Sequence, residues 1–329
     1  MKHFKNGELA GLVTNIQKYT IHDGPGIRTE IFFKGCTMHC RWCSNPETIS
    51  PAQELGVYPA KCVRDDKCGL CVRACPLGGG PIAFDGEHLI ASLTMVDECA
   101  GCLRCADECP GHAIKLWGEK MTADELMKII LEDLSFYRRT GGGVTLNGGE
   151  VLVQWEFARE LLRRCREQEI HTCVETALNV PTEHMEAVFE YTDLVLTDIK
   201  HMDTAKHREF TGAGNEQILK NIRRAAELGM KLVIRTPVVP GHNNSDEEIR
   251  AIGRFLRDEL GGRIVQYQLL PYRKMGTEKY DSLGRPYPMG DFVPPERGEW
   301  EANLLHLAEM LQREFSLPAV PGSGAKLEL

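Results

Sequence analysis

The cysteines of this chain are gathered in one stretch. Eleven of the thirteen lie between Cys36 and Cys109, and only Cys165 and Cys173, most simply small buried side chains, fall outside it. The first residues, MKHFKNGELAG, lack the apolar core of a signal peptide, so neither export nor a disulfide framework is expected. Clustered cysteines without export favour metal binding. The sequence therefore predicts a cytoplasmic protein, part of which folds around metal.

A short run near the N-terminus holds three of these cysteines. In KGCTMHCRWCSNPE they are spaced Cys36-x3-Cys40-x2-Cys43. Because a four-iron cluster normally takes four cysteine ligands, three thiolates would leave one iron without a protein ligand. Such an iron can bind a substrate, as the open position of a catalytic zinc does. A zinc site or unpaired core thiols are the alternatives, but zinc prefers matched C-x2-C pairs.

Two further cysteine runs end in Cys-Pro and are related to each other. They read Cys62-x5-Cys68-x2-Cys71-x3-Cys75-Pro76 and Cys99-x2-Cys102-x2-Cys105-x3-Cys109-Pro110. The second has the spacing of bacterial ferredoxins, in which three cysteines bind one cluster and the fourth binds the other. This crossed rule assigns one cluster to Cys62, Cys68, Cys71 and Cys109, and another to Cys75, Cys99, Cys102 and Cys105. Both clusters would be fully ligated, which suits electron transfer; a zinc-binding module is the alternative.

Apolar periodicity organises the rest of the chain. Two strands are expected at residues 13–21 and 27–33, so the three-cysteine run follows the second strand directly. From Met121 onward strands and helices alternate in about six units, which predicts a parallel sheet or barrel. The expected strands are 144–147, 171–176, 194–200, 231–239 and 264–272, and the expected helices are 122–138, 154–168, 215–228, 246–260 and 295–315. Loops at the carboxyl ends of such strands carry the chemistry of α/β proteins.

Composition and charge exclude two classes of partner. The net charge is −8, whereas a general nucleic-acid binder needs a basic face. Hydrophobic residues make up 42% of the chain and charged residues 26%, which is typical of a soluble globular protein. No apolar run approaches the length of a membrane span. We therefore expect neither nucleic acid nor a membrane as a partner, and 329 residues suffice for one α/β barrel with an insertion.

The three-cysteine run and its surroundings resemble a known family. The spacing, with Trp42 before the last cysteine, is similar to the signature of radical S-adenosylmethionine (SAM) enzymes. IHDGPGIR (residues 21–28) and CRWCSNPE (residues 40–47) resemble the activating enzymes of glycyl radical enzymes. The ferredoxin-like runs resemble the larger class of these activases, which carries a two-cluster insert that the short pyruvate formate-lyase type lacks. The resemblance covers nearly the whole chain, from about residue 12 to residue 315.

This resemblance implies a fold and a division into domains. The fold would be α/β, a partial (β/α)6 TIM-like barrel of the radical SAM type with an inserted 2[4Fe–4S] ferredoxin-like domain. Residues 12–57 and 116–315 would form the barrel, residues 58–115 the insert, and residues 316–329 a C-terminal tail. A barrel that is open along one side would admit a peptide loop of a partner.

The resemblance also implies contacts with the cofactor. The cluster held by Cys36, Cys40 and Cys43 would bind the amino and carboxylate groups of SAM through its open iron. Gly148-Gly149-Glu150 matches the GGE motif of the family, although Asn147 and Val151 stand where the family usually has Ser and Pro. The remaining implied contacts are Trp42, Glu175, Asp198 and Lys200, with a monovalent cation near Glu175 and Asp198. Arg273 stands where the family usually has a histidine near the ribose.

The implied activity is that of an anaerobic oxidoreductase. A flavodoxin- or ferredoxin-type donor would reduce the cluster, and the insert would relay the electrons or only dock a partner. SAM would be cleaved to methionine and a 5′-deoxyadenosyl radical, which takes a Cα hydrogen from a glycine of a partner glycyl radical enzyme. Asp23 and Arg28 are the implied contacts of that glycine loop, and a monomer is expected. The alternatives are a radical SAM enzyme that modifies another peptide or a small molecule, and an iron–sulfur electron-transfer protein without SAM chemistry.

Overall fold

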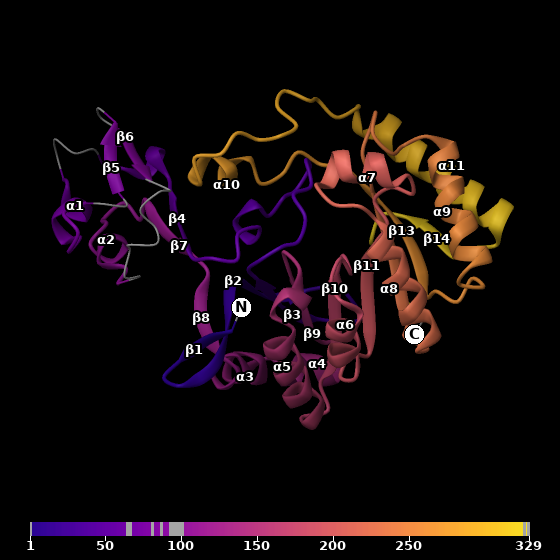
Figure 1. Ribbon diagram of the computed structural model, residues 1–329, viewed down its shortest axis with the longest axis horizontal. Coiled ribbons are helices and arrows are strands. Elements are labelled where there is room, and N and C mark those ends of the chain that lie inside the picture. The colour runs from indigo at the N-terminus through magenta and orange to yellow at the C-terminus, as the bar shows by residue number, and fades with distance from the viewer. Residues whose placement is uncertain are drawn as a thin grey trace.

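A mixed sheet that curls into an open barrel forms most of this protein (Figure 1). The computed structural model describes residues 2–63, 68–79, 82–85, 88–91, 102–324 and 327. The parallel part of its ten-stranded sheet consists, in spatial order, of β3 (Arg28–Phe33), β9 (Gly143–Gly148), β10 (His171–Thr176), β11 (Leu194–Asp198), β12 (Leu232–Val238), β13 (Gln266–Pro271) and β14 (Ala319–Pro321). Within the described residues the pairing does not close on itself. The predicted α/β partial barrel is therefore confirmed.

Antiparallel strands extend the sheet beyond β3. β2 (Glu8–Thr20) pairs with β3, which confirms the two strands predicted around the Gly-Pro turn. β1 (His3–Lys5) and β8 (Glu119–Thr122) both pair with β2. β8 lies between the insert and the barrel in Figure 1, so the chain returns from the insert to the barrel through this strand.

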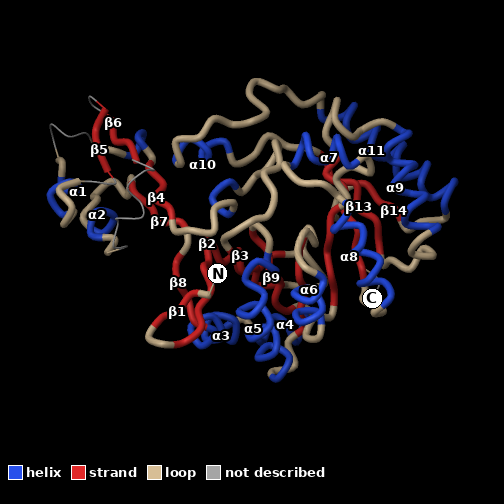
Figure 2. Tube along the Cα trace, viewed as in Figure 1, coloured by secondary structure: helices blue, strands red, loops and turns tan. Residues whose placement is uncertain are grey.

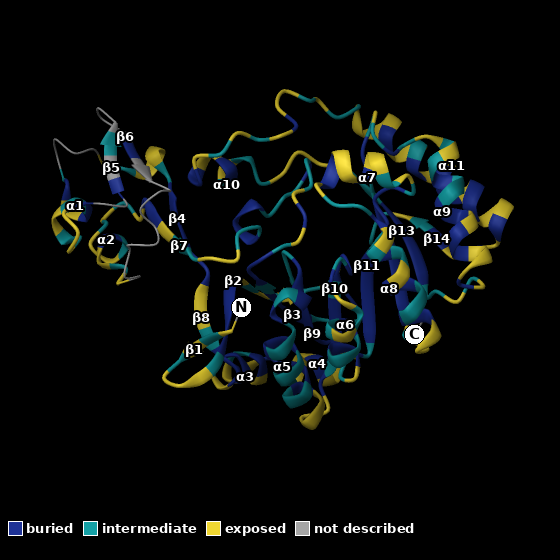
Figure 3. Ribbon diagram, in the orientation of Figure 1, coloured by how far each residue is buried: buried dark blue, intermediate teal, exposed yellow. Residues whose placement is uncertain are grey.

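Helices cover the outer face of the sheet, and their residues toward the sheet are largely buried (Figures 2 and 3). Apolar side chains pack together between the two layers. Successive side chains of a strand point to opposite faces. Val174 and Ile234 pack in this outer core, so the residues that follow them, Glu175 and Arg235, face the barrel interior. The covering helices are α3 (Ala123–Glu132), α4 (Leu134–Thr140), α5 (Trp155–Glu167), α6 (Thr182–Phe189), α8 (Glu216–Glu227), α9 (Asp246–Asp258) and α11 (Arg297–Phe315). None of the helices in the described part of the chain has the length and apolar character of a membrane span.

The insert has a small core of its own at one end of the molecule (Figure 1). Its elements are β4 (Glu54–Val57), α1 (Leu70–Ala74), β5 (Ile82–Asp85), β6 (His88–Ala91), α2 (Arg104–Asp107) and β7 (Ile114–Trp117). β4 pairs with β7 and β5 with β6, both antiparallel. Leu55, Ile82 and Ile114 are buried together with Cys71 and Cys105, so cysteines occupy positions that large apolar residues fill elsewhere.

Three features differ from the sequence prediction. Thr122 and Glu125 form the predicted capping box, but the expected helix 122–138 is divided at Asp133, whose carboxylate accepts a hydrogen bond from Thr29 Oγ1 (2.9 Å). Helix α6 and the short helices α7 (Thr204–Thr211) and α10 (Thr277–Ser282) are not predicted. The stretch 316–329, predicted as a tail, contains β14, because the backbone of β13 offers this segment hydrogen-bonding partners.

Candidate active site

The three-cysteine loop lies at the carboxyl end of β3, where the sequence predicts it. Its backbone is held from two sides. Gly35 and Cys36 donate hydrogen bonds to the carbonyls of Thr48 (2.7 Å) and Ile49 (2.9 Å), which belong to or follow the short 3₁₀ helix η1 (Pro46–Thr48). On the other side His39 donates to Thr211 O (2.7 Å) at the end of α7. The loop is thus positioned by backbone contacts before any metal binds.

The thiols of this loop are arranged for a cluster. Backbone N–H groups of Met38 and Asn45 donate to the sulfurs of Cys36 and Cys43, each at 3.4 Å. Burial raises the pKa of Cys36 and of Cys43 to about 12, so metal binding would have to displace their protons. Among the described residues no three Cys, His, Asp or Glu side chains lie close enough to share one metal ion.

The first two residues of the Gly-Gly-Glu motif are glycines because the end of β3, the start of the cysteine loop and η1 lie directly against them. A Cβ on Gly148, whose φ is +131°, would lie 2.2 Å from Phe33 O. A Cβ on Gly149 would lie 2.4 Å from Gly35 O and 2.6 Å from Thr48 O. Both distances are far below van der Waals contact, so any larger residue would push the cysteine loop away. The motif therefore positions the loop, whatever else it binds.

Glu150 is fully buried and already has protein partners. Its carboxylate accepts hydrogen bonds from Thr176 Oγ1 (2.6 Å), Ala177 N (3.0 Å) and Leu152 N (3.1 Å). Burial raises the pKa of Glu150, and these hydrogen bonds oppose that shift. Because an ionised carboxylate offers about four acceptor positions, one position is left for a ligand.

Lys200 is a buried cation beside the cysteine loop. Its ammonium lies 2.7 Å from Asp198 Oδ2. Burial by itself lowers the pKa of Lys200, but Asp198 and the thiols of Cys40 and Cys36 outweigh burial and raise it. Burial likewise raises the pKa of the Cys40 thiol, and Lys200 is the strongest opposing influence. Of the predicted DxK residues, Lys200 therefore supplies a buried ammonium whose charge acts on the proposed cluster ligands, and Asp198 holds that ammonium in place.

Arg235, which the sequence analysis did not single out, organises the barrel interior. Its Nη1 lies 2.7 Å from Asp23 Oδ1 and 3.1 Å from Glu175 Oε1, and its Nε donates to Gln268 Oε1 (2.9 Å). Glu30 on β3 lies in the same interior, close enough to Asp23 for the two carboxyl groups to affect each other. The only signal in the sequence was a basic residue within the apolar strand KLVIRTPVV.

The two residues expected to meet a partner loop differ in exposure, although Thr145 Oγ1 links them by accepting from Arg28 Nε and donating to Asp23 O. Asp23 is partly exposed beside Arg235 at the interior of the barrel. Arg28 is fully buried at the amino end of β3, where it donates to Thr145 Oγ1 (2.7 Å), Val144 O (2.5 Å) and Pro25 O (3.0 Å). Arg28 therefore braces β3 against β9, and its buried guanidinium is not available to a partner.

An aromatic cluster covers one side of the cysteine loop. Trp42 packs against Phe210 (ring centroids 6.1 Å apart) and His242 (5.8 Å). Its Nε1 is buried and has no hydrogen-bond partner among the described residues, so a donor is available there for a bound molecule. Arg273, which replaces the usual histidine, is exposed.

The insert brings together the four cysteines that the crossed rule assigns to one cluster. Cys62, Cys68, Cys71 and Cys109 line a single small cavity. Burial raises the pKa of Cys71, and the thiols of Cys109, Cys62 and Cys68 raise it further, as expected of close neighbours. Of the second set, Cys75, Cys102 and Cys105 are described and Cys99 lies outside the described residues.

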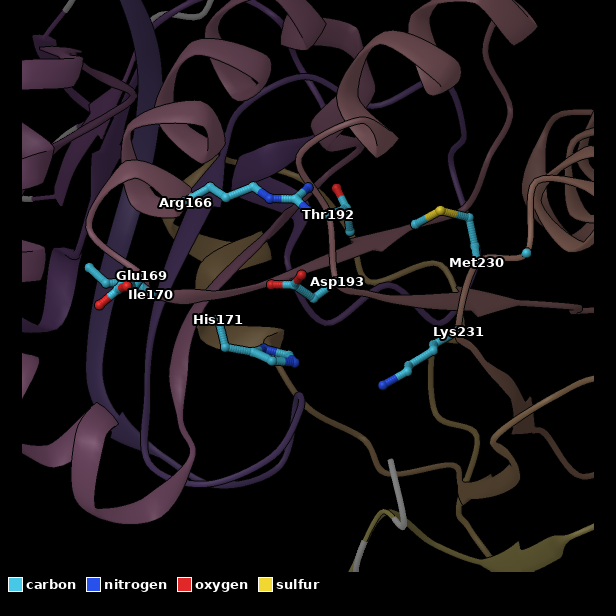
Figure 4. Close-up of a pocket in the computed structure, with 9 residues that line it drawn as sticks. Arg166, Glu169, Ile170, His171, Thr192, Asp193, Met230 and Lys231 are labelled. Carbon is cyan, nitrogen blue, oxygen red and sulfur yellow. The ribbon is translucent and has the colours of Figure 1, made fainter.

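A cavity without a predicted role lies at the opposite end of the barrel. It measures about 540 Å³ and opens at the amino ends of β10 to β12, where His171, Asp193 and Lys231 line it (Figure 4). Burial, together with the guanidinium of Arg28, lowers the pKa of His171 to about 4, so this imidazole is neutral. Conserved chemistry in barrels of this type sits at the other end of the strands, and this cavity lacks cysteine.

The interior carboxylates predict a pH-dependent stability. Burial raises the pKa of Glu175 to about 8 and that of Glu30 to about 7; Asp23 adds to both shifts, Asp198 adds to that of Glu175, and Arg235 opposes both. The folded state then binds more protons than the unfolded state at intermediate pH, so stability falls as the pH rises from about 4.5 to about 8.

Glu175→Gln removes one of these titrating groups. We expect the variant to lose less stability than the parent across this range, by on the order of 2 kcal/mol. Thermal unfolding followed by circular dichroism at several pH values measures this, with the exposed Glu183→Gln as control. An unchanged slope in Glu175→Gln would contradict the assignment.

Comparisons relate the chain to known proteins. A model of the radical SAM superfamily matches residues 99–252, a 4Fe–4S dicluster domain matches residues 55–110, and a 4Fe–4S single cluster domain matches residues 22–65. The (2S)-3-sulfopropanediol dehydratase activating enzyme of Klebsiella oxytoca is 42% identical over 305 residues, which cover 91% of this chain and 93% of that protein. The isethionate sulfite-lyase activating enzyme of Oleidesulfovibrio alaskensis is 42% identical over 311 residues, covering 94% and 98%. A solved domain of pyruvate-formate lyase-activating enzyme from Bacteroides vulgatus is 32% identical, with a TM-score of 0.45, and covers 55% of this chain and 99% of that domain.

Proposed function

Because this chain belongs to the radical SAM family of glycyl radical enzyme activating enzymes, we propose that Cys36, Cys40 and Cys43 hold a [4Fe–4S] cluster whose open iron binds SAM. When bound, the cluster and SAM supply the reductive cleavage and the hydrogen-atom abstraction that install a glycyl radical on the partner enzyme. The observation that carries this proposal is the buried cation of Lys200 beside the thiols of Cys36 and Cys40. A cation there suits both an anionic cluster and the carboxylate of SAM.

The residues around the cluster loop would orient SAM. Lys200 offers a donor for its carboxylate, and the remaining acceptor position of Glu150 suits its ammonium. Trp42 presents its ring and an unpartnered donor, while Gly148 and Gly149 keep the loop backbone close to β9. Glu175 and Asp198 would hold a monovalent cation between them and the ligand. Arg235 lies 3.1 Å from Glu175 and Lys200 lies 2.7 Å from Asp198.

The ligand sets in the insert support two additional clusters, which makes three in all. Cys62, Cys68, Cys71 and Cys109 would hold one, and Cys75, Cys99, Cys102 and Cys105 the other. We propose residues 58–115 as the two-cluster unit, which receives electrons from a flavodoxin- or ferredoxin-type donor. A monomeric state and a cytoplasmic location remain predictions.

The partner's glycine loop would enter through the open side of the barrel and meet Asp23. We expect Asp23→Asn to lower the yield of glycyl radical by about tenfold, because a charge-assisted hydrogen bond to the loop is lost. SAM cleavage in the absence of the partner should change by less than about twofold, since Asp23 belongs to no proposed set of cluster or SAM ligands. Asp124→Asn, which changes an exposed carboxylate on α3, is the matched control. Equal losses in both reactions would argue against a role in partner recognition.

The proposed function is tested by one anaerobic reaction. The reconstituted protein is mixed with SAM, a strong reductant and a candidate partner, and the glycyl radical is sought by electron paramagnetic resonance while 5′-deoxyadenosine is measured by chromatography. The partners named for its relatives, a (2S)-3-sulfopropanediol dehydratase and an isethionate sulfite-lyase, are tried first. Cleavage of SAM without a glycyl signal from any partner would favour another peptide or small molecule as substrate. No cleavage at all would favour an electron-transfer protein.

A further inference from the structure

The segment between β13 and α11 folds back over the cysteine loop. Gly276, just before α10, lies so close to the loop that a Cβ on it would be 2.3 Å from Ser44 O. Lys279 on α10 donates to Asn45 Oδ1 (2.9 Å) and Glu47 Oε1 (2.6 Å). Figure 1 shows α10 between β4 of the insert and the mouth of the barrel. This segment is therefore held in a defined position against the last cysteine of the loop.

Tyr280, on α10, has a buried hydroxyl group that the described part of the protein leaves without a hydrogen bond. The residue is 3% exposed, and its ring packs edge-on against Tyr287 (centroids 5.2 Å apart). Its Oη has no hydrogen-bond partner among the described residues. Burial raises the pKa of Tyr280, and the thiols of Cys43 and Cys40 raise it further. The contacts of Gly276 with Ser44 and of Lys279 with Asn45 hold α10, which carries Tyr280, against the Cys43 end of the loop. Burying a hydroxyl without a partner costs free energy that a phenylalanine would avoid.

A hydrogen-bond acceptor that arrives with a bound cofactor would explain why residue 280 is a tyrosine and not a phenylalanine. We propose that Tyr280 donates a hydrogen bond to an inorganic sulfide of the site cluster at its Cys43 corner, and so raises the reduction potential of that cluster. Such a bond needs an acceptor that the protein alone does not supply, because the described residues offer the Tyr280 hydroxyl no hydrogen-bond partner. Hydrogen bonds to cluster sulfurs stabilise the more negative, reduced state. This inference rests on the proposed function, since it requires a cluster at Cys36, Cys40 and Cys43.

The experiment must distinguish the cluster from a second possible acceptor for the Tyr280 hydroxyl, the carboxylate of Glu47. Glu47 Oε2 is also buried without a hydrogen-bond partner in the described part of the chain, while its Oε1 accepts from Lys279. If the Tyr280 hydroxyl donates a hydrogen bond to Glu47 Oε2 instead, it stabilises the position of α10 and leaves the reduction potential of the cluster unchanged. The potential itself is therefore the measurement that decides.

The test is a potentiometric titration of the intact, reconstituted protein. The reduced site cluster is followed by the electron paramagnetic resonance signal that changes on addition of SAM, which distinguishes it from clusters in the insert. Tyr280→Phe should shift its midpoint to a more negative potential, lowering the ratio of reduced to oxidised cluster at a fixed potential about threefold to tenfold, the range of one net hydrogen bond. Iron content and thermal midpoint confirm that the variant is folded and loaded.

Tyr287→Phe is the matched control. It removes a phenol hydroxyl from the same aromatic group, but one already paired with Tyr272 (Oη to Oη 2.8 Å), and should leave the potential unchanged. If the midpoint potential does not shift in Tyr280→Phe, or shifts equally in the two variants, the inference is overturned. The proposed function still stands in that case, provided that the variants cleave SAM. If the unmodified protein shows no signal that responds to SAM, the proposed function is overturned and the inference with it.

Discussion

Cys40→Ala should remove the site cluster and reduce SAM cleavage to background. Cys40 is the middle thiol of the loop, and with only Cys36 and Cys43 left a second iron would lose its protein ligand. Lys200, which faces this thiol, would then be a buried cation without the anionic cluster beside it. Iron and sulfide content per chain, the SAM-sensitive paramagnetic signal, and 5′-deoxyadenosine formed under anaerobic conditions measure the result.

Cys165→Ala is the matched control for this loss. Cys165 is fully buried on α5, 3.8 Å from Met127 Sδ, and takes part in no proposed ligand set. Its replacement should leave iron content and SAM cleavage unchanged, at a cost in stability of about 1–2 kcal/mol for the small cavity. A Cys40→Ala variant that still cleaves SAM at the parent rate would refute the assignment of the cluster.

Lys34→Met should be among the most destabilising single changes in the barrel. The side chain of Lys34 is fully buried, two residues before Cys36, with its ammonium 2.6 Å from both Glu54 Oε2 and Glu47 O. Burial lowers the pKa of Lys34, and Glu54 opposes that shift. Removing one member of a buried pair leaves the other charge uncompensated, so we expect a loss of about 3 kcal/mol, softened because Arg285 also contacts Glu54. The midpoint of thermal unfolding should fall by about 4 °C.

Lys5→Met tests whether burial of the ion pair is the reason for the loss of stability expected in Lys34→Met. Lys5 pairs with Glu125 at 2.7 Å, but both side chains are about one-third exposed. Because exposed ion pairs contribute little, its loss should cost less than about 1 kcal/mol. Equal losses in the two variants would show that the Lys34 pair is not the anchor that the structure implies. A lower iron content in Lys34→Met at 20 °C would add that the pair also positions the cysteine loop.

Much of the fold follows from local patterns in the sequence. The parallel strands ending at Asp198 and Val238 were predictable because apolar runs alternate with amphipathic helices, and the capping box at Thr122 marks the start of α3. The break at Asp133 was not, because its cause is a hydroxyl 104 residues away, on Thr29. Short elements such as α10 have too few residues to show a period, so tertiary contacts define them.

The candidate site divides in the same way. The spacing of Cys36, Cys40 and Cys43 and the duplicated Cys-Pro runs predict iron–sulfur chemistry by themselves, and the matches to 4Fe–4S domain families support that prediction, while the assignment of each ligand stays a proposal. The surroundings of those ligands were decided only by the tertiary structure. Arg235 meets Asp23 across 212 residues, and Lys279 meets Glu47 across 232. No local pattern records such contacts, because they exist only once the strands have paired and α10 has folded back onto the loop.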